Sequence, residues 1–283
     1  GEIFGLLGPN GCGKTTTINC LLSLLSYDKG DIEIFGEEIS PTNYKLKSQI
    51  GVVMQNVAVF DELTVSENID YFCGLYIRDK ALRKQYVEEA IAFVGLEHFR
   101  KFYPKKLSGG LLRRLNIACG IAHKPKLIIL DEPTVAVDPQ SRNKILEGIV
   151  ELNRRGATIL YTSHYMDEVE QICSRIAIID QGKNLALGTT EELKKLIKKS
   201  EIITIDILTL TEEDIAAIRQ LPHVYEVSFD QHKLTVLCSG GQHNLIHVLD
   251  YLQKKSYSFG YVHSELPSLN DVFLEITGKE LRD

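Results

Sequence analysis

The stretch GPNGCGKTT at residues 8–16 restricts the fold of this chain more than any other feature of its sequence. The apolar run EIFGLLG at 2–8 is typical of a buried strand, and TTTINCLLSLL at 15–25 is apolar enough for a helix packed on a sheet. The pattern Gly-x-x-x-x-Gly-Lys-Thr between a strand and a helix is that of the P-loop, whose backbone N–H groups converge on phosphate oxygens. The sequence therefore predicts an α/β fold that binds a nucleoside triphosphate through this loop.

Within this loop the side chains have separate expected roles. Lys14 should reach the β- and γ-phosphates, and the Thr15 hydroxyl should ligate Mg²⁺. The helix that follows adds the partial positive charge of its N-terminus. The residues predicted to contact ATP are Gly8, Pro9, Asn10, Gly11, Cys12, Gly13, Lys14, Thr15 and Thr16.

The run LIILDEP at 127–133 supplies a second part of such a site. Four apolar residues deliver Asp131 to the carboxyl end of a buried strand, where α/β sheets bind their ligands. Asp131 is predicted to lie on the Mg²⁺ side, and Glu132 is predicted to be the general base for the attacking water. The residues alone leave open a second interpretation, an Asp-Glu helix cap before Pro133.

Two further polar residues end strand-like runs. His164 closes ATILYTSH at 157–164, and Gln55 closes GVVMQ at 51–55. His164 is predicted to contact the γ-phosphate or to hold the attacking water, and Gln55 is predicted to ligate Mg²⁺ or to contact the same water. A lone histidine is more often structural, so both assignments depend on the neighbouring motifs.

Strands and helices alternate over residues 1–200, which favours a mostly parallel sheet covered on both faces. Strand signals vanish over about 61–123, where segments such as YVEEAIAFVGL have helical periodicity, so a helical insertion is predicted there. Inside it, LSGGLLRRL at 107–115 is a second Ser-Gly-Gly turn at the start of a helix. Such a turn is suited to an anion, although the chain already has one phosphate loop.

Residues 201–283 have a different pattern. Strand, helix, strand, strand, helix and strand signals follow one another, which is the β-α-β-β-α-β order of a ferredoxin-like unit. A last helix opens with Ser268 as a plausible N-cap. The predicted organisation is therefore an ATPase domain over 1–200 and an accessory α+β domain over 201–283, with the charged run KKLIKKS at 194–200 as a helix end and linker.

Composition narrows the classes of function. The net charge of −6 argues against nucleic acid as the main partner, because phosphate backbones require clustered Lys and Arg. No apolar run in the sequence approaches the ~18 residues that span a bilayer. The six cysteines are scattered without a C-x-x-C pair, which is typical of reduced thiols in a cytosolic protein.

The order of these motifs resembles that of the nucleotide-binding domain of ATP-binding-cassette (ABC) proteins, over about residues 1–195. The matched elements are Walker A at 8–16, the Q-loop at Gln55, the LSGG signature at 107–110, the catalytic glutamate Glu132, the D-loop at 135–138 and the switch histidine His164.

The resemblance has departures as well. Leu111 follows LSGG where the family often has Gln, and Val135 begins a D-loop that often reads Ser-Gly-Leu-Asp. The Val135 change puts hydrogen bonding across the dimer in doubt. The family's strands upstream of the Gly-Glu at 1–2, and an aromatic residue that stacks on adenine, are also absent from this sequence.

The resemblance answers why one domain has two anion-binding turns. In the family, the signature of one subunit covers the ATP held on the P-loop of a second subunit. Ser108, Gly109 and Gly110 are therefore expected to contact ATP in trans, within a homodimer or a dimer with a paralogous ABC ATPase. ATP and Mg²⁺ are the implied substrate and cofactor.

The chain is most similar to ATPase subunits of bacterial type-2 ABC exporters. The resemblance implies export of drugs, antibiotics or peptides, a separate transmembrane permease, and a location at the cytoplasmic face of the bacterial cell membrane. Residues 56–69, NVAVFDELTVSENI, and the helical insertion would form the groove for the permease. The alternative is an ABC ATPase that acts on ribosomes or nucleic acid without transport.

Overall fold

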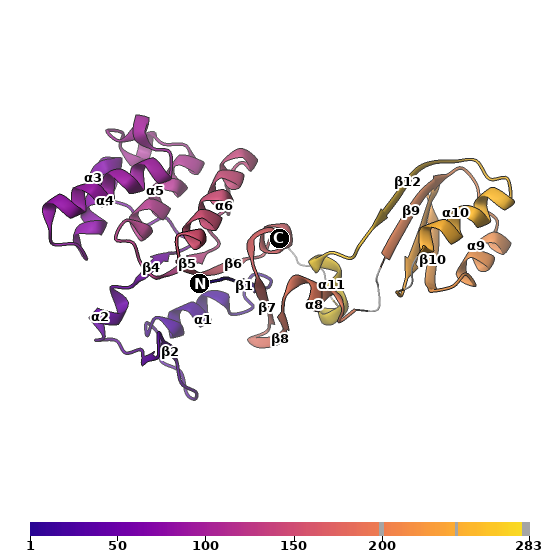
Figure 1. The fold of residues 1–283 in the computed structure, drawn as a ribbon, viewed down its shortest axis with the longest axis horizontal. Coiled ribbons are helices and arrows are strands. Elements are labelled where there is room, and N and C mark those ends of the chain that lie inside the picture. The colour runs from indigo at the N-terminus through magenta and orange to yellow at the C-terminus, as the bar shows by residue number, and fades with distance from the viewer. Residues whose placement is uncertain (198–200, 241–242, 279–283) are drawn as a thin grey trace. The chain divides into compact units, whose positions relative to one another are not determined.

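The structure is a computed structural model that describes residues 1–197, 201–240 and 243–278 of the 283-residue chain. The chain divides into two compact units, of which the first comprises residues 1–187 and the second begins at Gly188 (Figure 1). Residues 198–200, at the end of the expected linker, lie outside the described residues.

A six-stranded sheet forms the centre of the first unit, with the strand order β4-β5-β6-β1-β7-β8. Its strands are β1 (Ile3–Leu7), β4 (Ile50–Val53), β5 (Leu127–Asp131), β6 (Thr158–Ser163), β7 (Arg175–Asp180) and β8 (Lys183–Gly188). The pairs from β4 to β7 are parallel. β8 follows β7 after the two-residue turn Gln181–Gly182, and so short a connection joins antiparallel strands.

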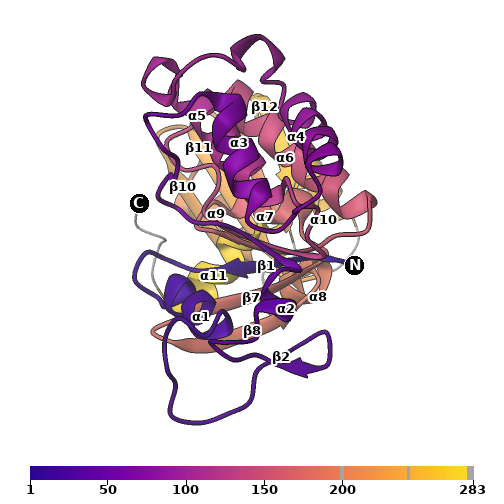
Figure 2. The same cartoon turned by 90° about the vertical axis from the view of Figure 1, so that its left-hand side faces the viewer.

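Helices cover both faces of this sheet, with α1 on one side of the strands and α6 and α7 on the other (Figure 2). The covering helices are α1 (Lys14–Leu21), α2 (Tyr44–Lys47), α6 (Pro139–Arg154) and α7 (Met166–Ile172). Ile18 of α1 packs in one apolar cluster with Ile129 of β5. On the opposite face, α7 lies so close to β1 that a Cβ on Gly5 would be 2.9 Å from Val169 Cγ1.

The chain between β4 and β5 forms the helical insertion. Its elements are α3 (Val65–Gly74), α4 (Lys80–Phe93), α5 (Gly109–Ile121) and two 3-10 turns, η1 (Glu97–Phe99) and η2 (Pro104–Lys106). α3 begins at a capping box, in which the Thr64 hydroxyl and the Glu67 carboxylate each accept a hydrogen bond from the other residue's backbone N–H. α5 is packed tightly on the sheet, because a Cβ on Gly51 would lie 2.4 Å from the Gly120 carbonyl oxygen.

One expected strand is much shorter than its pattern indicates. The alternation in DIEIFG at 31–36 predicts a strand, but β2 covers only Glu33–Ile34 and pairs with β3 (Glu37–Glu38). The intervening Phe35 and Gly36 have φ values of 55° and 75°, so the chain reverses there in a two-residue hairpin turn. The turn therefore ends the strand that the side-chain alternation alone would have continued.

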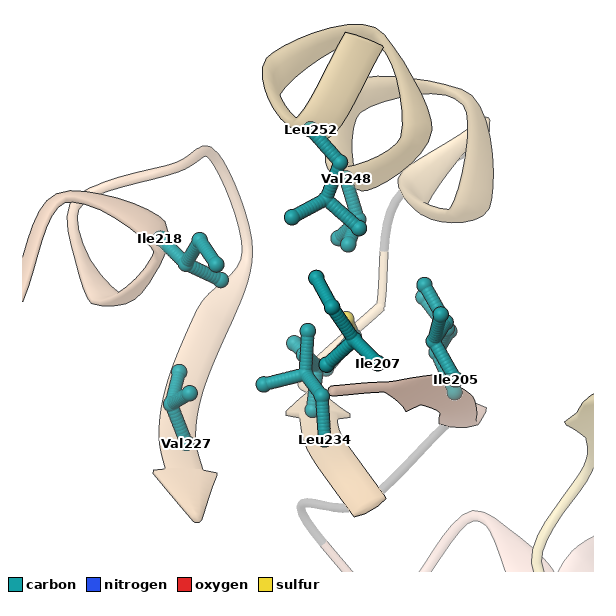
Figure 3. Close-up of a cluster of buried hydrophobic side chains, with 10 residues drawn as sticks. Ile205, Ile207, Ile218, Val227, Leu234, Val248 and Leu252 are labelled. Atoms are coloured by element: carbon teal, nitrogen blue, oxygen red, sulfur yellow. The ribbon is translucent and has the colours of Figure 1, made fainter. Parts of the chain in front are cut away.

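The second unit contains a four-stranded antiparallel sheet with the order β10-β11-β9-β12. Its elements are β9 (Glu201–Ile207), α9 (Glu212–Arg219), β10 (Val224–Asp230), β11 (Lys233–Cys238), α10 (Asn244–Lys254) and β12 (Phe259–Glu265). Ile218 of α9 and Leu252 of α10 point toward the strand residues Ile205, Val227 and Leu234 and form one core with them (Figure 3). The predicted β-α-β-β-α-β unit and the mostly parallel α/β core are both confirmed.

Two short helices flank this antiparallel sheet in the sequence. α8 (Thr190–Lys194) contacts α11 (Leu269–Thr277), and the second unit therefore begins before Glu201. Ser268 caps α11, since its hydroxyl accepts a hydrogen bond from the Asp271 backbone N–H at 3.3 Å. In the part of the chain that the structure describes, no helix combines the length and apolar character needed to cross a bilayer.

Candidate nucleotide-binding site

The phosphate loop connects the carboxyl end of β1 to the first turn of α1. A Cβ on Gly8 would lie 2.3 Å from the Ile179 carbonyl oxygen and 2.6 Å from Cys12 Sγ, so the loop backbone leaves no room for a side chain there. Gly13 has a φ of 113° and turns the chain into the helix. The first-turn N–H groups of α1 have no intrahelical acceptors, and they are available to an anion.

Lys14 is buried at the start of α1. Its Nζ donates hydrogen bonds to the carbonyl oxygens of Gly8 at 2.8 Å and Pro9 at 3.1 Å. The same Nζ lies 3.1 Å from Glu132 Oε1. The cation is therefore held between the phosphate loop and the end of β5.

Oxygen atoms suited to Mg²⁺ meet where β5 approaches α1. The Thr15 hydroxyl donates to Asp131 Oδ2 at 2.9 Å, and the Thr162 hydroxyl donates to Asp131 Oδ1 at 2.6 Å. Hydroxyl and carboxylate oxygens are the ligands that Mg²⁺ prefers. The predicted donors Thr15 and Asp131 are in direct contact, and their chemistry fits the ion.

Glu132 occupies the centre of the site. It is only 5% exposed and adopts a left-handed backbone conformation with a φ of 48°, while its N–H donates to Thr162 Oγ1 at 3.0 Å. Gln55 Nε2 donates to Glu132 Oε2 at 3.0 Å, and His164 Nδ1 lies 3.5 Å from Glu132 Oε1. The structure thus brings Lys14, Gln55 and His164 together around one buried carboxylate. The helix-cap interpretation is wrong, because the chain forms turns after Glu132 and the next helix begins only at Pro139, with Asp138 as its N-cap.

The signature residues lie at the start of α5. Ser108 is its N-cap, and the Ser108 hydroxyl accepts a hydrogen bond from the Leu111 N–H at 3.3 Å. A Cβ on Gly110 would lie 2.4 Å from Ser141 Oγ, so this turn packs against the start of α6. Among the described residues, no hydrogen bond or ion pair joins Ser108, Gly109 or Gly110 to the phosphate loop of the same chain.

Two buried groups beside the site were not predicted from the sequence. Arg113 is 3% exposed and donates hydrogen bonds to backbone carbonyl groups on both sides of the site. Burial lowers the pKa of its guanidinium, and the charges of Asp131 and Glu132 oppose that shift. The Glu168 carboxylate accepts hydrogen bonds from Thr134 at 2.7 Å and Tyr161 at 2.6 Å. In the sequence, Arg113 lies in a helical segment with a second arginine next to it, where a charged side chain is expected to face solvent. The sequence therefore carries no signal that this arginine is buried.

Comparison with known proteins gives consistent matches over both units. Residues 1–135 match the family model of ABC transporters, and residues 188–277 match that of the C-terminal domain of DrrA1-3-like ATP-binding proteins. Over its full length the chain is 39% identical to the linearmycin resistance ATP-binding protein LnrL of Bacillus subtilis, of which it covers 92%. It is 32% identical to the Nod factor export ATP-binding protein I of Ralstonia nicotianae, again over its full length, and covers 87% of that protein.

A solved structure agrees with the fold of the first unit. The ATP-binding cassette MJ0796, determined as a dimer in a post-hydrolysis state with ADP and phosphate, superposes with a TM-score of 0.60 and 26% identity. The match covers 66% of this chain and 85% of that one.

The fold and the site define a P-loop nucleoside triphosphatase. The full-length matches show that the chain belongs to the ATP-binding subunits of ABC transporters, enzymes that couple ATP hydrolysis to transport.

Proposed function

We propose that this chain powers a bacterial exporter of drugs, antibiotics or peptides, at the cytoplasmic face of the membrane and together with a separate transmembrane permease. The names of its relatives, which refer to linearmycin resistance and to Nod factor export, support export as the direction of transport. They favour transport over action on ribosomes or nucleic acid.

The position of Glu132 carries the proposed chemistry. A buried carboxylate within hydrogen-bond reach of Gln55 and beside His164 and Lys14 is suited to orient a water molecule and to accept its proton. Lys14 would stabilise the negative charge of the β- and γ-phosphates, and His164 would hold the γ-phosphate or the water.

Mg²⁺ would be held by Thr15 and Asp131, whose oxygens are already in contact, with Gln55 as a further ligand. The bound ion would neutralise charge on the phosphates. Thr162 fixes the second oxygen of Asp131, so that the carboxylate keeps its orientation.

The second anion-binding turn supports a composite site formed by two copies of the chain. α5 has 13 residues and begins at Ser108, Gly109 and Gly110, and its N-terminal N–H groups would contact the ATP bound to a second subunit. The dimeric form of MJ0796 is consistent with this arrangement. We therefore infer a two-fold dimer, either with an identical chain or with a paralogous ATPase, in which ATP bridges the subunits.

A groove beside the Q-loop is suited to the permease. A cavity of about 220 Å³ lies between β4, α3 and α5, and Met54, Tyr76, Asn116 and His123 are among its lining residues. The side chains of Phe60 and Tyr71 are exposed next to it and pack edge to face with ring centroids 4.9 Å apart. An amphipathic helix of the permease would bury these apolar groups and reach the segment that carries Gln55.

The first test is Glu132→Gln in the purified chain, with Glu151→Gln on α6 as the matched control. Loss of the general base should reduce ATP turnover by about 100-fold or more. ATP binding should persist, and ATP should convert the variant into a dimer that sedimentation detects. Undiminished turnover in Glu132→Gln would contradict the general-base role. A monomer at saturating ATP would contradict a composite site formed by two identical chains and would leave the dimer with a paralogous ATPase.

The transport role needs a separate test. Capture of the tagged chain from detergent-solubilised membranes should recover a multi-span protein. Recovery of ribosomes or nucleic acid in its place would contradict the proposed function.

A further inference from the structure

Arg113 lies on α5, where this helix meets the segment that follows β4 and the segment that follows β5. Its Nε donates to the Pro133 carbonyl oxygen at 2.7 Å, and its Nη2 donates to the Glu132 carbonyl oxygen. Its Nη1 donates to the carbonyl oxygens of Met54 at 3.1 Å and Gln55 at 2.6 Å. One guanidinium therefore ties the signature helix α5 to the backbone of Gln55 and of Glu132.

A second side chain on the same face of α5 supports this connection. Asn116, one turn after Arg113, accepts a hydrogen bond from the Ala58 N–H at 3.1 Å and donates to the Met54 carbonyl oxygen at 3.4 Å. Residues 54–58 are thus held on both sides of Gln55 by α5. Because α5 also meets β4 in close backbone contact at Gly51 and Gly120, the helix cannot shift without moving this segment.

We propose that Arg113 is a positioning residue that couples the signature helix to Gln55 and Glu132 of the same chain. This inference rests on the proposed function, in which the signature contacts the ATP of the second subunit. A displacement of α5 by that ATP would move the Gln55 and Glu132 carbonyl groups through the guanidinium. Each active site would then respond to the nucleotide bound in the other.

The geometry of the guanidinium explains why an arginine is needed to hold these carbonyl groups in place. The guanidinium presents five N–H donors in a rigid planar fork, whereas lysine offers three rotatable donors on a flexible chain. The substitution Arg113→Lys would retain the charge, but the ammonium group could not hold the Gln55 and Glu132 carbonyl oxygens in fixed relative positions. A variant that keeps the charge therefore separates positioning from electrostatics.

The experiment compares Arg113→Lys with Arg114→Lys in the full chain. Arg114 is adjacent on α5, but it donates within the helical insertion to the Val94 carbonyl oxygen at 2.9 Å. Arg113→Lys should lower kcat by about tenfold, which corresponds to about 1.4 kcal/mol, with KM for ATP within about threefold of the wild type. The Hill coefficient for ATP should fall toward 1, and the Tm should remain close to that of Arg114→Lys.

Two results would overturn the inference. One is a kcat and a Hill coefficient for Arg113→Lys that match those of Arg114→Lys. The other is a parallel loss of ATP binding and Tm, which would indicate a structural role alone. Glu132→Gln separates the two hypotheses: if it abolishes turnover while Arg113→Lys does not lower it, the proposed function stands and only the coupling role fails.

Asn116→Ala provides an independent measurement where Arg113→Lys does not accumulate as folded protein. It loosens the segment around Gln55 and leaves the bonds of Arg113 to residues 132 and 133 in place. It should lower kcat in the wild-type background but have little further effect in a Gln55→Ala background. An equal effect in both backgrounds, or none in either, would overturn the inference.

Discussion

Cys12 and Gly8 together determine the shape of the phosphate loop. Cys12 is 3% exposed, and its sulfur fills the space against which a side chain at position 8 would collide. Burial raises the pKa of the Cys12 thiol, which therefore remains protonated at neutral pH. Cys12 acts as a small packing group inside the loop rather than as a reactive thiolate.

Substitutions of two glycines in this loop should have different effects. In Gly8→Ala the new Cβ collides with the Ile179 carbonyl oxygen, so the backbone must move, at a cost of about 1–3 kcal/mol, and ATP affinity should fall at least tenfold. Gly11→Ala meets no atom within 4 Å, but its φ of 79° should cost about 1 kcal/mol. ATP titration and thermal unfolding measure both effects. Equal losses of affinity in the two variants would contradict this interpretation.

At the scale of elements, a buried carboxylate joins α9 and α10, two of the helices of the second unit. Asp214, in the first turn of α9, accepts a hydrogen bond from the Tyr251 hydroxyl of α10 at 2.6 Å and another from Tyr257. The Thr211 hydroxyl also donates to Asp214, and Lys255 Nζ lies 3.4 Å from it. The hydrogen bonds from Thr211, Tyr251 and Tyr257 hold the pKa of Asp214 well below its usual value.

Removing one of these donors should make stability depend on pH. Tyr251→Phe should destabilise the second unit by about 1–2 kcal/mol at pH 7, because it removes a hydrogen bond to a charged group. The folded-state pKa lies below the unfolded-state value of about 4, so the stabilisation is complete above pH 4 and is lost as pH falls further. The difference between wild type and Tyr251→Phe in urea unfolding should therefore shrink below pH 4. Tyr261→Phe, on the exposed strand β12, is the control and should leave stability unchanged at every pH.

At the scale of the whole molecule, each unit has its own apolar core. The core of the second unit is formed by its antiparallel sheet with α9 and α10, and the separate family-model match that begins at residue 188 agrees with that division. α8 contributes the fully buried Leu193, and α11 contributes the equally buried Val272. The second unit therefore includes α8 as well as the strands and helices after Glu201.

A fragment of residues 188–283 should consequently fold by itself. We expect a single cooperative urea transition, followed by circular dichroism. A fragment of residues 201–283, which lacks α8, should unfold at lower urea concentration because Val272 and Phe273 of α11 lose an apolar neighbour. If both fragments had the same midpoint, α8 would contribute nothing to this unit.

Much of the fold and of the candidate site could be predicted because their signals are local. The phosphate loop, the strand ending in Asp131 and the β-α-β-β-α-β order each depend on residues close together in sequence. The hairpin at Phe35 and Gly36 was missed because strand alternation does not report a positive φ. Arg113 was missed because a buried arginine that bonds to backbone carbonyl groups has the same sequence pattern as a solvated one.

The sequence by itself determined which chemical groups this protein possesses and the order in which they follow its strands. Only the tertiary structure decided that Glu132 meets Lys14, Gln55 and His164, which are far apart along the chain. The physical reason is the strand order, which places β4, β5, β6 and β1 side by side and in parallel. Their carboxyl ends therefore share one edge of the sheet, and the polar residues that follow these strands in the chain meet there.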